Sequence, residues 1–260
     1  MTFGLRVMGY GLVCLALASG CKAHGAAPAE DPKTAWRAFY EITRIRVGEP
    51  KVSLRDTSSE ILLPPRPELS MSLSSAIRSR RSRRELSEEP ITLSELSALV
   101  YYSIGITGES NGHALRAAPS AGALYPTELI VAVHEVEGLE PGLYRYDPQR
   151  HSLSFYKKGK VASILPGIAI GQAHAGRGAC AVIITSKVQR SMGKYGQRGF
   201  RYALIDAGAA CENLYLAAEA LGLGTVAIGA FGDEALANLL GLEEDELPLL
   251  IMPIGHIQER

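Results

Sequence analysis

Residues 116–126 read RAAPSAGALYP, and residues 222–232 read GLGTVAIGAFG. Both runs interleave small residues with residues that favour β-strands, a mixture that differs from an ordinary core strand or helix. Small side chains allow the backbone to approach a flat ligand closely. Taken alone, however, each run is more typical of plain packing, and the second run also suits a buried strand punctuated by glycine.

A third unusual segment is the arginine cluster RSRRSRR at residues 78–84, which holds five arginines with Ser82 among them. A guanidinium group can donate two parallel hydrogen bonds to two oxygens of a phosphate group, and a nearby hydroxyl adds one more donor. Two other interpretations stay open, a solvated helix end and a basic patch on anionic lipid. The 27 basic and 27 acidic residues of the chain cancel, so any anion site is local and no nucleic-acid partner is predicted.

The three segments contain ordered motifs: RRSRR at 80–84, PSAGALYP at 119–126 and VAIGAF at 226–231. Three further motifs support them: GLYRY at 142–146, KYGQRGFR at 194–201 and NLYLAA at 213–218. In this order the motifs resemble the nitroreductase-like FMN oxidoreductases. The chain is most similar to their SagB-type branch, which is related to the dehydrogenases that aromatise azoline rings in peptide natural products. The resemblance covers about residues 70–257.

The resemblance implies an FMN-dependent oxidoreductase with an α+β, nitroreductase-like fold, in which helices flank a central mixed or antiparallel sheet. It also implies a homodimer that binds FMN at the subunit interface. The residues implied for the ribityl phosphate and the pyrimidine edge are Arg80, Arg81, Ser82 and Arg84. Those implied to lie against the flavin from the second subunit are Pro119, Ser120, Ala121, Ala123 and Leu124. Those implied beside the ring system and its reactive N5 are Gln172, Ile228, Gly229 and Ala230.

Lys194 and Tyr195 are the candidate catalytic pair. In the azoline-oxidising relatives that the chain resembles, a Lys-Tyr pair is implicated in proton handling beside the flavin. Removal of a hydride from an azoline ring requires loss of a proton from the neighbouring atom, so a base is needed. The alternative interpretation is a lysine in a surface loop and a tyrosine that serves packing.

The predicted reaction moves a hydride between flavin N5 and a small organic or ring substrate. One alternative is an NAD(P)H-dependent nitro or quinone reductase, and another is a non-catalytic flavin-binding surface lipoprotein. Two departures from the family pattern motivate the last alternative. The chain has Gly208-Ala209 where relatives often carry a histidine after the glycine, and it has only a short tail after Gly255.

The first 21 residues predict an export signal, because Arg6 precedes a short apolar run that ends in Leu-Ala-Ser-Gly-Cys. Small residues before a cysteine resemble a bacterial lipobox, so we expect acylation of Cys21 and membrane anchoring on the periplasmic side or cell surface. An ordinary secretory signal is the alternative. Residues 22–69, rich in proline, predict a tether and an N-terminal arm with a short helix over 35–46. The six scattered histidines predict no metal site.

The remaining chain, residues 70–260, predicts one catalytic domain. The absence of strict strand–helix alternation indicates the α+β class. The segment 202–221 is apolar nearly all round, which predicts a helix buried on every side, at the centre of the domain or at a dimer interface. The other expected helices span 70–79, 92–102, 161–172 and 234–240, and the expected strands span 129–136, 143–146, 153–156, 179–185, 225–231 and 247–254.

Overall fold

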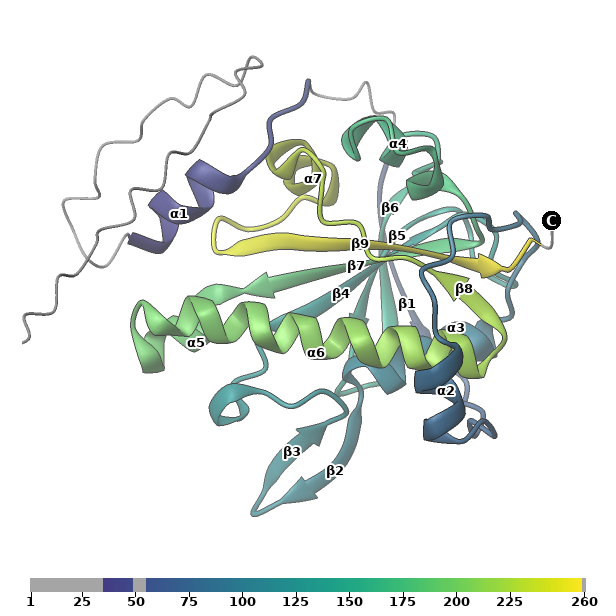
Figure 1. Ribbon diagram of the computed structural model, residues 1–260, viewed down its shortest axis with the longest axis horizontal. Helices are drawn as coiled ribbons and strands as arrows, with labels where there is room; N and C mark the ends of the chain where they lie inside the picture. The colour runs from purple at the N-terminus through teal and green to yellow at the C-terminus, as the bar shows by residue number, and fades with distance from the viewer. Residues whose placement is uncertain (1–34, 49–54, 259–260) are drawn as a thin grey trace, which may run out of the picture.

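The structure is a computed structural model that describes residues 35–48 and 55–258. Seven strands form one antiparallel sheet in the order β1-β6-β5-β4-β7-β9-β8, and β2 and β3 form a separate hairpin (Figure 1). The strands are β1 (Arg55–Leu62), β2 (Ile106–Ser110), β3 (His113–Arg116), β4 (Thr127–Val133), β5 (Gly142–Asp147), β6 (Ser152–Lys158), β7 (Cys180–Lys187), β8 (Leu223–Thr225) and β9 (Glu246–His256). The helices are α1 (Ala35–Thr43), α2 (Leu73–Ser79), α3 (Leu93–Ile104), α4 (Leu165–Ile168), α5 (Val188–Tyr195), α6 (Arg198–Ala220) and α7 (Asp233–Leu240), with the short 3-10 helices η2 (Ala121–Ala123) and η3 (Ala173–Gly176).

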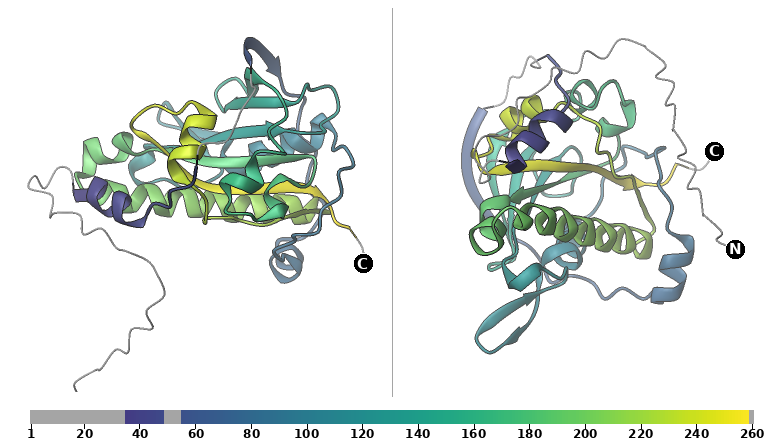
Figure 2. Two further views of the ribbon diagram at one scale, coloured as in Figure 1. Left: turned by 90° about the horizontal axis from the view of Figure 1, so that it is seen from above. Right: turned by 60° about the vertical axis from the view of Figure 1, so that its left-hand side comes forward.

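Helices cover both faces of the sheet, and the central strands are buried on both sides (Figures 1 and 2). Successive side chains of a strand point to opposite faces. Accordingly, Leu129 and Val131 of β4 pack in the core that α3 and α6 cover, whereas Ile130 and Ala132 pack in the core that α4 and α7 cover. The continuous apolar runs at 129–136 and 179–185 therefore correctly predicted central strands. The α+β class is confirmed.

Helix α3 begins where the sequence indicated. The Glu95 backbone N–H donates to Thr92 Oγ1 at 3.1 Å, and the Thr92 N–H donates to Glu95 Oε2 at 2.8 Å. This reciprocal capping box satisfies two backbone donors that the helix leaves open at its start. The strands expected at 143–146 and 153–156 are also confirmed; they are β5 and β6, which pair antiparallel with Tyr146 opposite Leu153.

Two predicted elements are wrong in part. Residues 161–172 were expected to be one helix, but only the four residues of α4 are α-helical. Pro166 lies in the first turn of α4, where proline is tolerated. The helix ends before Ile170 and Gly171, which adopt left-handed φ values of 58° and 77°. Residues 225–231 were expected to be a strand, but β8 ends at Thr225. Beyond it the Ala227 N–H donates to a tyrosine side chain instead of a neighbouring strand.

The segment 22–69 contributes more than a tether. Its residues 55–62 form β1, which pairs antiparallel with β6 at the edge of the sheet, with Glu60 opposite Ser154. The sheet thus begins before residue 70. The predicted signal, its Cys21 and the beginning of the tether lie outside the described residues. Within residues 35–48 and 55–258, no helix combines the length and apolar character needed to cross a bilayer.

The long helix α6 is not buried on every side, which corrects the prediction of a central helix. It packs on the sheet through residues such as Ala203 and Ala210, but Leu204 and Ile205 are 38% and 61% exposed. The apolar residues that extended around the helix in the sequence therefore form an uncovered stripe in the single chain. Burial of this stripe at a dimer interface stays a prediction.

Candidate active site

The arginine cluster joins the end of β8 and the helix α6. The Arg83 backbone N–H donates to the Thr225 carbonyl at 2.8 Å. Ser82 Oγ lies 3.1 Å from the Tyr215 hydroxyl, which also accepts a hydrogen bond of 2.7 Å from the Ala227 N–H. Tyr215, on α6, therefore ties two of the predicted flavin segments together through one buried hydroxyl. The sequence reasoning included Tyr215 in a supporting motif but assigned it no role.

The guanidinium groups of the cluster have different surroundings. Arg80 lies over the Tyr215 ring, 4.9 Å from its centroid, and its Nε lies 3.6 Å from Glu212. Arg81 instead donates to the carbonyls of residues 78 and 80 in its own turn, at 2.9 and 2.8 Å. Arg84 forms no hydrogen bond or ion pair with the described residues. Its guanidinium is therefore available to a ligand.

An open pocket of about 970 Å³ lies beside this cluster. Arg83 Nε is buried and lacks a partner among the described residues. Unpaired guanidinium donors and a hydroxyl at one pocket are the donor set that a phosphate group requires, so these residues fit the phosphate end of a nucleotide cofactor. The pocket is lined by Ser82, Arg83, Arg84, Glu85, Gly222, His256, Ile257 and Gln258.

The segment after β8 is held in place from two sides. The backbone N–H and C=O of Ile228 pair with those of Ile251, at 2.9 Å each. Gln172 Nε2 donates to the Ala230 carbonyl at 3.0 Å, so two residues predicted to lie at the ring system are in contact. Gly229 is exposed and forms no hydrogen bond with the described residues. A fixed backbone with a free N–H at Gly229 suits contact with a flat polar ring.

Lys194 and Tyr195, at the end of α5, lie against the first small-residue run, residues 116–126. Lys194 Nζ is 5.4 Å from the Tyr195 ring centroid, and the Tyr195 ring meets Tyr202 edge-on at 5.1 Å. Gly122, with a left-handed φ of 65°, faces the pair so closely that an added Cβ would lie 2.8 Å from Lys194 Nζ. The structure thus brings the predicted catalytic pair and the turn of Pro119–Leu124 together.

Asp206 of α6 anchors this turn, and the sequence reasoning missed it. Ser120 Oγ donates to Asp206 Oδ2 at 2.6 Å and accepts from the Tyr125 N–H at 2.9 Å. The Ala121 N–H reaches the other carboxylate oxygen at 3.4 Å. Asp206 is only 6% exposed, and this burial raises the pKa of its carboxyl group above the ordinary range, although the two hydrogen bonds oppose the shift. Asp206 is the only charged residue of the stretch 202–211 in α6, and this isolated acidic residue was the signal in the sequence.

The arginine cluster at 78–84 and the cluster formed by Lys194, Tyr195 and the turn at 119–124 lie apart along α6. Tyr202 contacts the catalytic pair and Tyr215 contacts the arginine cluster, and they are 13 residues apart in one helix. At a rise of 1.5 Å per residue this separation is about 20 Å along the helix axis. Within one chain, therefore, Lys194 and Tyr195 are not brought beside Arg80, Ser82 or Arg84.

Comparison with known proteins gives the family. Residues 77–256 match the sequence profile of the nitroreductase family. The chain belongs to this family. It is 39% identical over 197 residues to the protein MJ1384 of Methanocaldococcus jannaschii, a match that covers 76% of this chain and 96% of that protein. It is 25% identical over 154 residues to the microcin B17-processing protein McbC of Escherichia coli, covering 57% of each.

A solved structure from Ralstonia eutropha shares the fold of this nitroreductase-family chain, with a TM-score of 0.68 and 28% identity over 82% of this chain and 98% of that one. The family predicted from the motifs is thus confirmed, and the matches to McbC and to the trifolitoxin-processing protein TfxB agree with the SagB-type branch. The protein is an oxidoreductase of the nitroreductase family.

Proposed function

We propose that this nitroreductase-family protein is an FMN-dependent homodimer that moves a hydride between flavin N5 and a small organic or ring substrate. The observation that carries the proposal is the separation of the two clusters along α6. Neither cluster is a complete active site by itself. The arginine cluster offers hydrogen-bond donors for a phosphate group, whereas the other cluster offers the Lys194–Tyr195 pair for proton transfer. A two-fold dimer would place the turn at 119–124 and the Lys194–Tyr195 pair of one subunit over the pocket of the other.

The cofactor-binding half would rest on Ser82, Arg84 and the segment 228–230. Arg80 and Arg84 would neutralise a phosphate, and the Ser82 hydroxyl, oriented by Tyr215, would add a neutral donor. Gln172, by holding the Ala230 carbonyl, would keep the Gly229 N–H aimed at the ring. When bound, FMN supplies the hydride chemistry, whereas the protein supplies orientation and hydrogen bonds.

The proton-handling half would rest on Lys194 and Tyr195. As a hydride leaves one carbon of the substrate, the neighbouring atom loses a proton, which Lys194 Nζ or the Tyr195 side-chain oxygen would accept. The close contact with Gly122 would hold both groups at the wall of the cleft. The exposed stripe with Leu204 and Ile205 would form part of the subunit contact.

The first experiment is an absorbance spectrum of the purified protein with and without added FMN. We expect an absorbance band at about 450 nm, which is typical of bound flavins. A protein that carries no flavin and takes up none from solution would refute the proposal. Sedimentation of the same sample tests the dimer, and a strictly monomeric FMN complex would refute the shared cleft.

The catalytic pair is tested by Lys194→Met, with Lys160→Met as the control, because Lys160 is an exposed lysine on the connection after β6. We expect the first change to leave FMN binding intact and to slow flavin reduction by a thiazoline peptide about 10²- to 10⁴-fold, the range for loss of a general base. Equal rates in both variants would favour a non-catalytic flavin-binding role.

The direction of the reaction depends on the electron donor. We propose that residues 1–21 are an export signal, that Cys21 is acylated, and that the domain works outside the cytoplasm on a tether. Nicotinamide cofactors are scarce there, which supports dehydrogenase or quinone-linked chemistry. Rapid reduction of the flavin by NADH or NADPH in stopped flow would instead support the nitro or quinone reductase. Mass spectrometry of the membrane fraction tests the lipid on Cys21.

A further inference from the structure

Residues 35–48, called the α1 segment here because they include α1, precede residues 77–256, the part of the chain that matches the family. The segment is nevertheless attached to the family domain. The Ile45 N–H donates to Asp233 Oδ2 at 2.8 Å, and the Asp233 N–H donates to the Ile45 carbonyl at 3.1 Å. These reciprocal hydrogen bonds fix the far end of the α1 segment at the first residue of α7.

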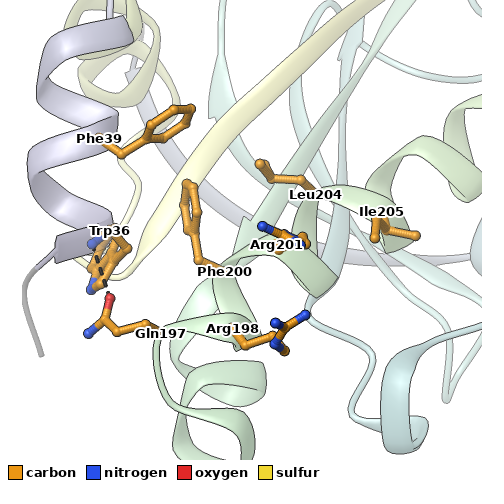
Figure 3. Close-up of a pocket in the computed structure, with 8 residues that line it drawn as sticks. All are labelled: Trp36, Phe39, Gln197, Arg198, Phe200, Arg201, Leu204 and Ile205. Carbon is orange, nitrogen blue, oxygen red and sulfur yellow. Dashed lines mark hydrogen bonds between the residues drawn. The ribbon is translucent and has the colours of Figure 1, made fainter. Parts of the chain in front are cut away.

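The start of the α1 segment packs through Trp36 on the corner where α5 meets α6. The Trp36 backbone N–H donates to Gln197 Oε1 at 3.1 Å, and the Trp36 ring centroid lies 5.6 Å from that of Phe200 (Figure 3). Trp36 is only 5% exposed. It belongs to the same buried cluster as Val188 and Met192, which are two of the buried residues of α5. Trp36 therefore contributes to the packing that holds α5 in place.

The candidate catalytic pair lies between these contacts along the chain. Lys194 and Tyr195 are the last two residues of α5. Met192 comes two residues before Lys194, and Gln197 comes two residues after Tyr195. Gly196, with a left-handed φ of 57°, ends α5 at this point, so no continuous helix links the pair to α6. The direction in which the two side chains point therefore depends on how the α5–α6 corner is packed.

We propose that Trp36 is a positioning residue, which holds Lys194 and Tyr195 within reach of the substrate by packing on the α5–α6 corner. The inference rests on the proposed function, in which this pair handles the proton. Proton transfer requires groups within hydrogen-bond reach, and a displacement of about 1 Å can cost about 10²-fold in rate. The phosphate end of the cofactor site is remote, because Phe200 and Tyr215 are 15 residues apart in α6, or about 22 Å along its axis.

The test is a double-mutant cycle in the full-length, FMN-loaded protein, read as flavin reduction by a thiazoline peptide. Trp36→Leu is made in the wild type and in a background that carries Lys194→Met and Tyr195→Phe. In the wild type we expect reduction to slow about 10- to 100-fold, with FMN binding unchanged. In the background without the pair we expect less than about twofold further loss, because a residue that acts through the pair has nothing left to position.

Two further variants and a second measurement complete the test. Trp36→Phe keeps a ring beside Phe200 and is expected to restore most of the rate that Trp36→Leu loses. Phe155→Leu is the matched control, because Phe155 is also buried but stacks on Tyr144 at 4.4 Å within the sheet; we expect its rate to stay within about twofold of the wild type. Hydrogen exchange over residues 188–197 needs no substrate, and we expect Trp36→Leu to accelerate it.

Two results overturn this inference and leave the proposed function standing. Equal fold-losses from Trp36→Leu with and without the pair would show that Trp36 supports the fold alone. Unchanged hydrogen exchange over residues 188–197 would show that α5 does not depend on Trp36. A different result refutes the proposed catalytic role and this inference with it: a protein with Lys194→Met and Tyr195→Phe that reduces its flavin as fast as the wild type.

Discussion

Replacing Tyr215 by phenylalanine removes one oxygen atom and leaves the ring in place. That oxygen accepts the Ala227 N–H at 2.7 Å and lies 3.1 Å from Ser82 Oγ. Tyr215 is 8% exposed, so water reaches the vacated position poorly and the Ala227 N–H loses its acceptor. A buried donor without a partner costs about 1–3 kcal/mol of folding free energy.

For a domain of this size, 1 kcal/mol corresponds to about 2–4 °C in Tm. A cost near the middle of that range, about 2 kcal/mol, predicts that Tyr215→Phe lowers the Tm of flavin-free protein by about 4–8 °C. The same hydroxyl orients Ser82 and fixes the start of the segment 226–231. We therefore expect the FMN dissociation constant to rise about tenfold, the equivalent of one hydrogen bond.

Thermal melts followed by circular dichroism measure the first effect, and quenching of FMN fluorescence on titration measures the second. Tyr101→Phe is the control, because the Tyr101 hydroxyl forms no hydrogen bond with the described residues. If Tyr215→Phe and Tyr101→Phe melt together and bind FMN equally, Tyr215 does not link the two flavin segments, and the reasoning is refuted.

Two further predictions concern the other cluster. Gly122→Ala would introduce a Cβ at a left-handed φ of 65°, 2.8 Å from Lys194 Nζ, so we expect loss of turnover with FMN binding retained; steady-state rates equal to the wild type would contradict the contact. The raised pKa of Asp206 means that the folded state holds the proton more tightly than the unfolded state. Its contribution to stability is therefore present below the ordinary value of 3.8 and is lost as pH rises through the raised pKa. Urea unfolding of wild type and Asp206→Asn across that window should show the wild type losing stability relative to the variant as pH rises, and parallel curves would exclude the shift.

The sequence correctly predicted those helices and strands that can be recognised from their own residues alone. The strands β4 and β7 are buried on both faces, so the apolar runs predicted as strands at 129–136 and 179–185 correctly indicated the centre of the sheet, although β4 ends at Val133. The capping box at Thr92 located the start of α3. The motif at 80–84 predicted a phosphate site, and its residues Ser82, Arg83 and Arg84 line one pocket. Binding of FMN there stays a prediction.

Other features depend on partners that are distant in the chain. Ser120 and Asp206 are 86 residues apart, and Ser82 and Tyr215 are 133 apart, so no local pattern reveals that either pair meets. The strand β1 reads RDTSSEIL and lacks alternation of apolar and polar residues. Its place is set by backbone pairing with β6, which propensity alone does not report.

The edge strand β1 also has a consequence for handling the protein. The family match begins at residue 77, and β1 lies before it. A fragment cut at that boundary would lose β1 and leave the backbone donors and acceptors along one side of β6 open. Open edges of this kind recruit strands from other molecules. The eight residues of β1 thus shield β6 from intermolecular strand pairing, and an expression fragment that starts at residue 77 should precipitate where one that starts ahead of residue 55 stays dispersed.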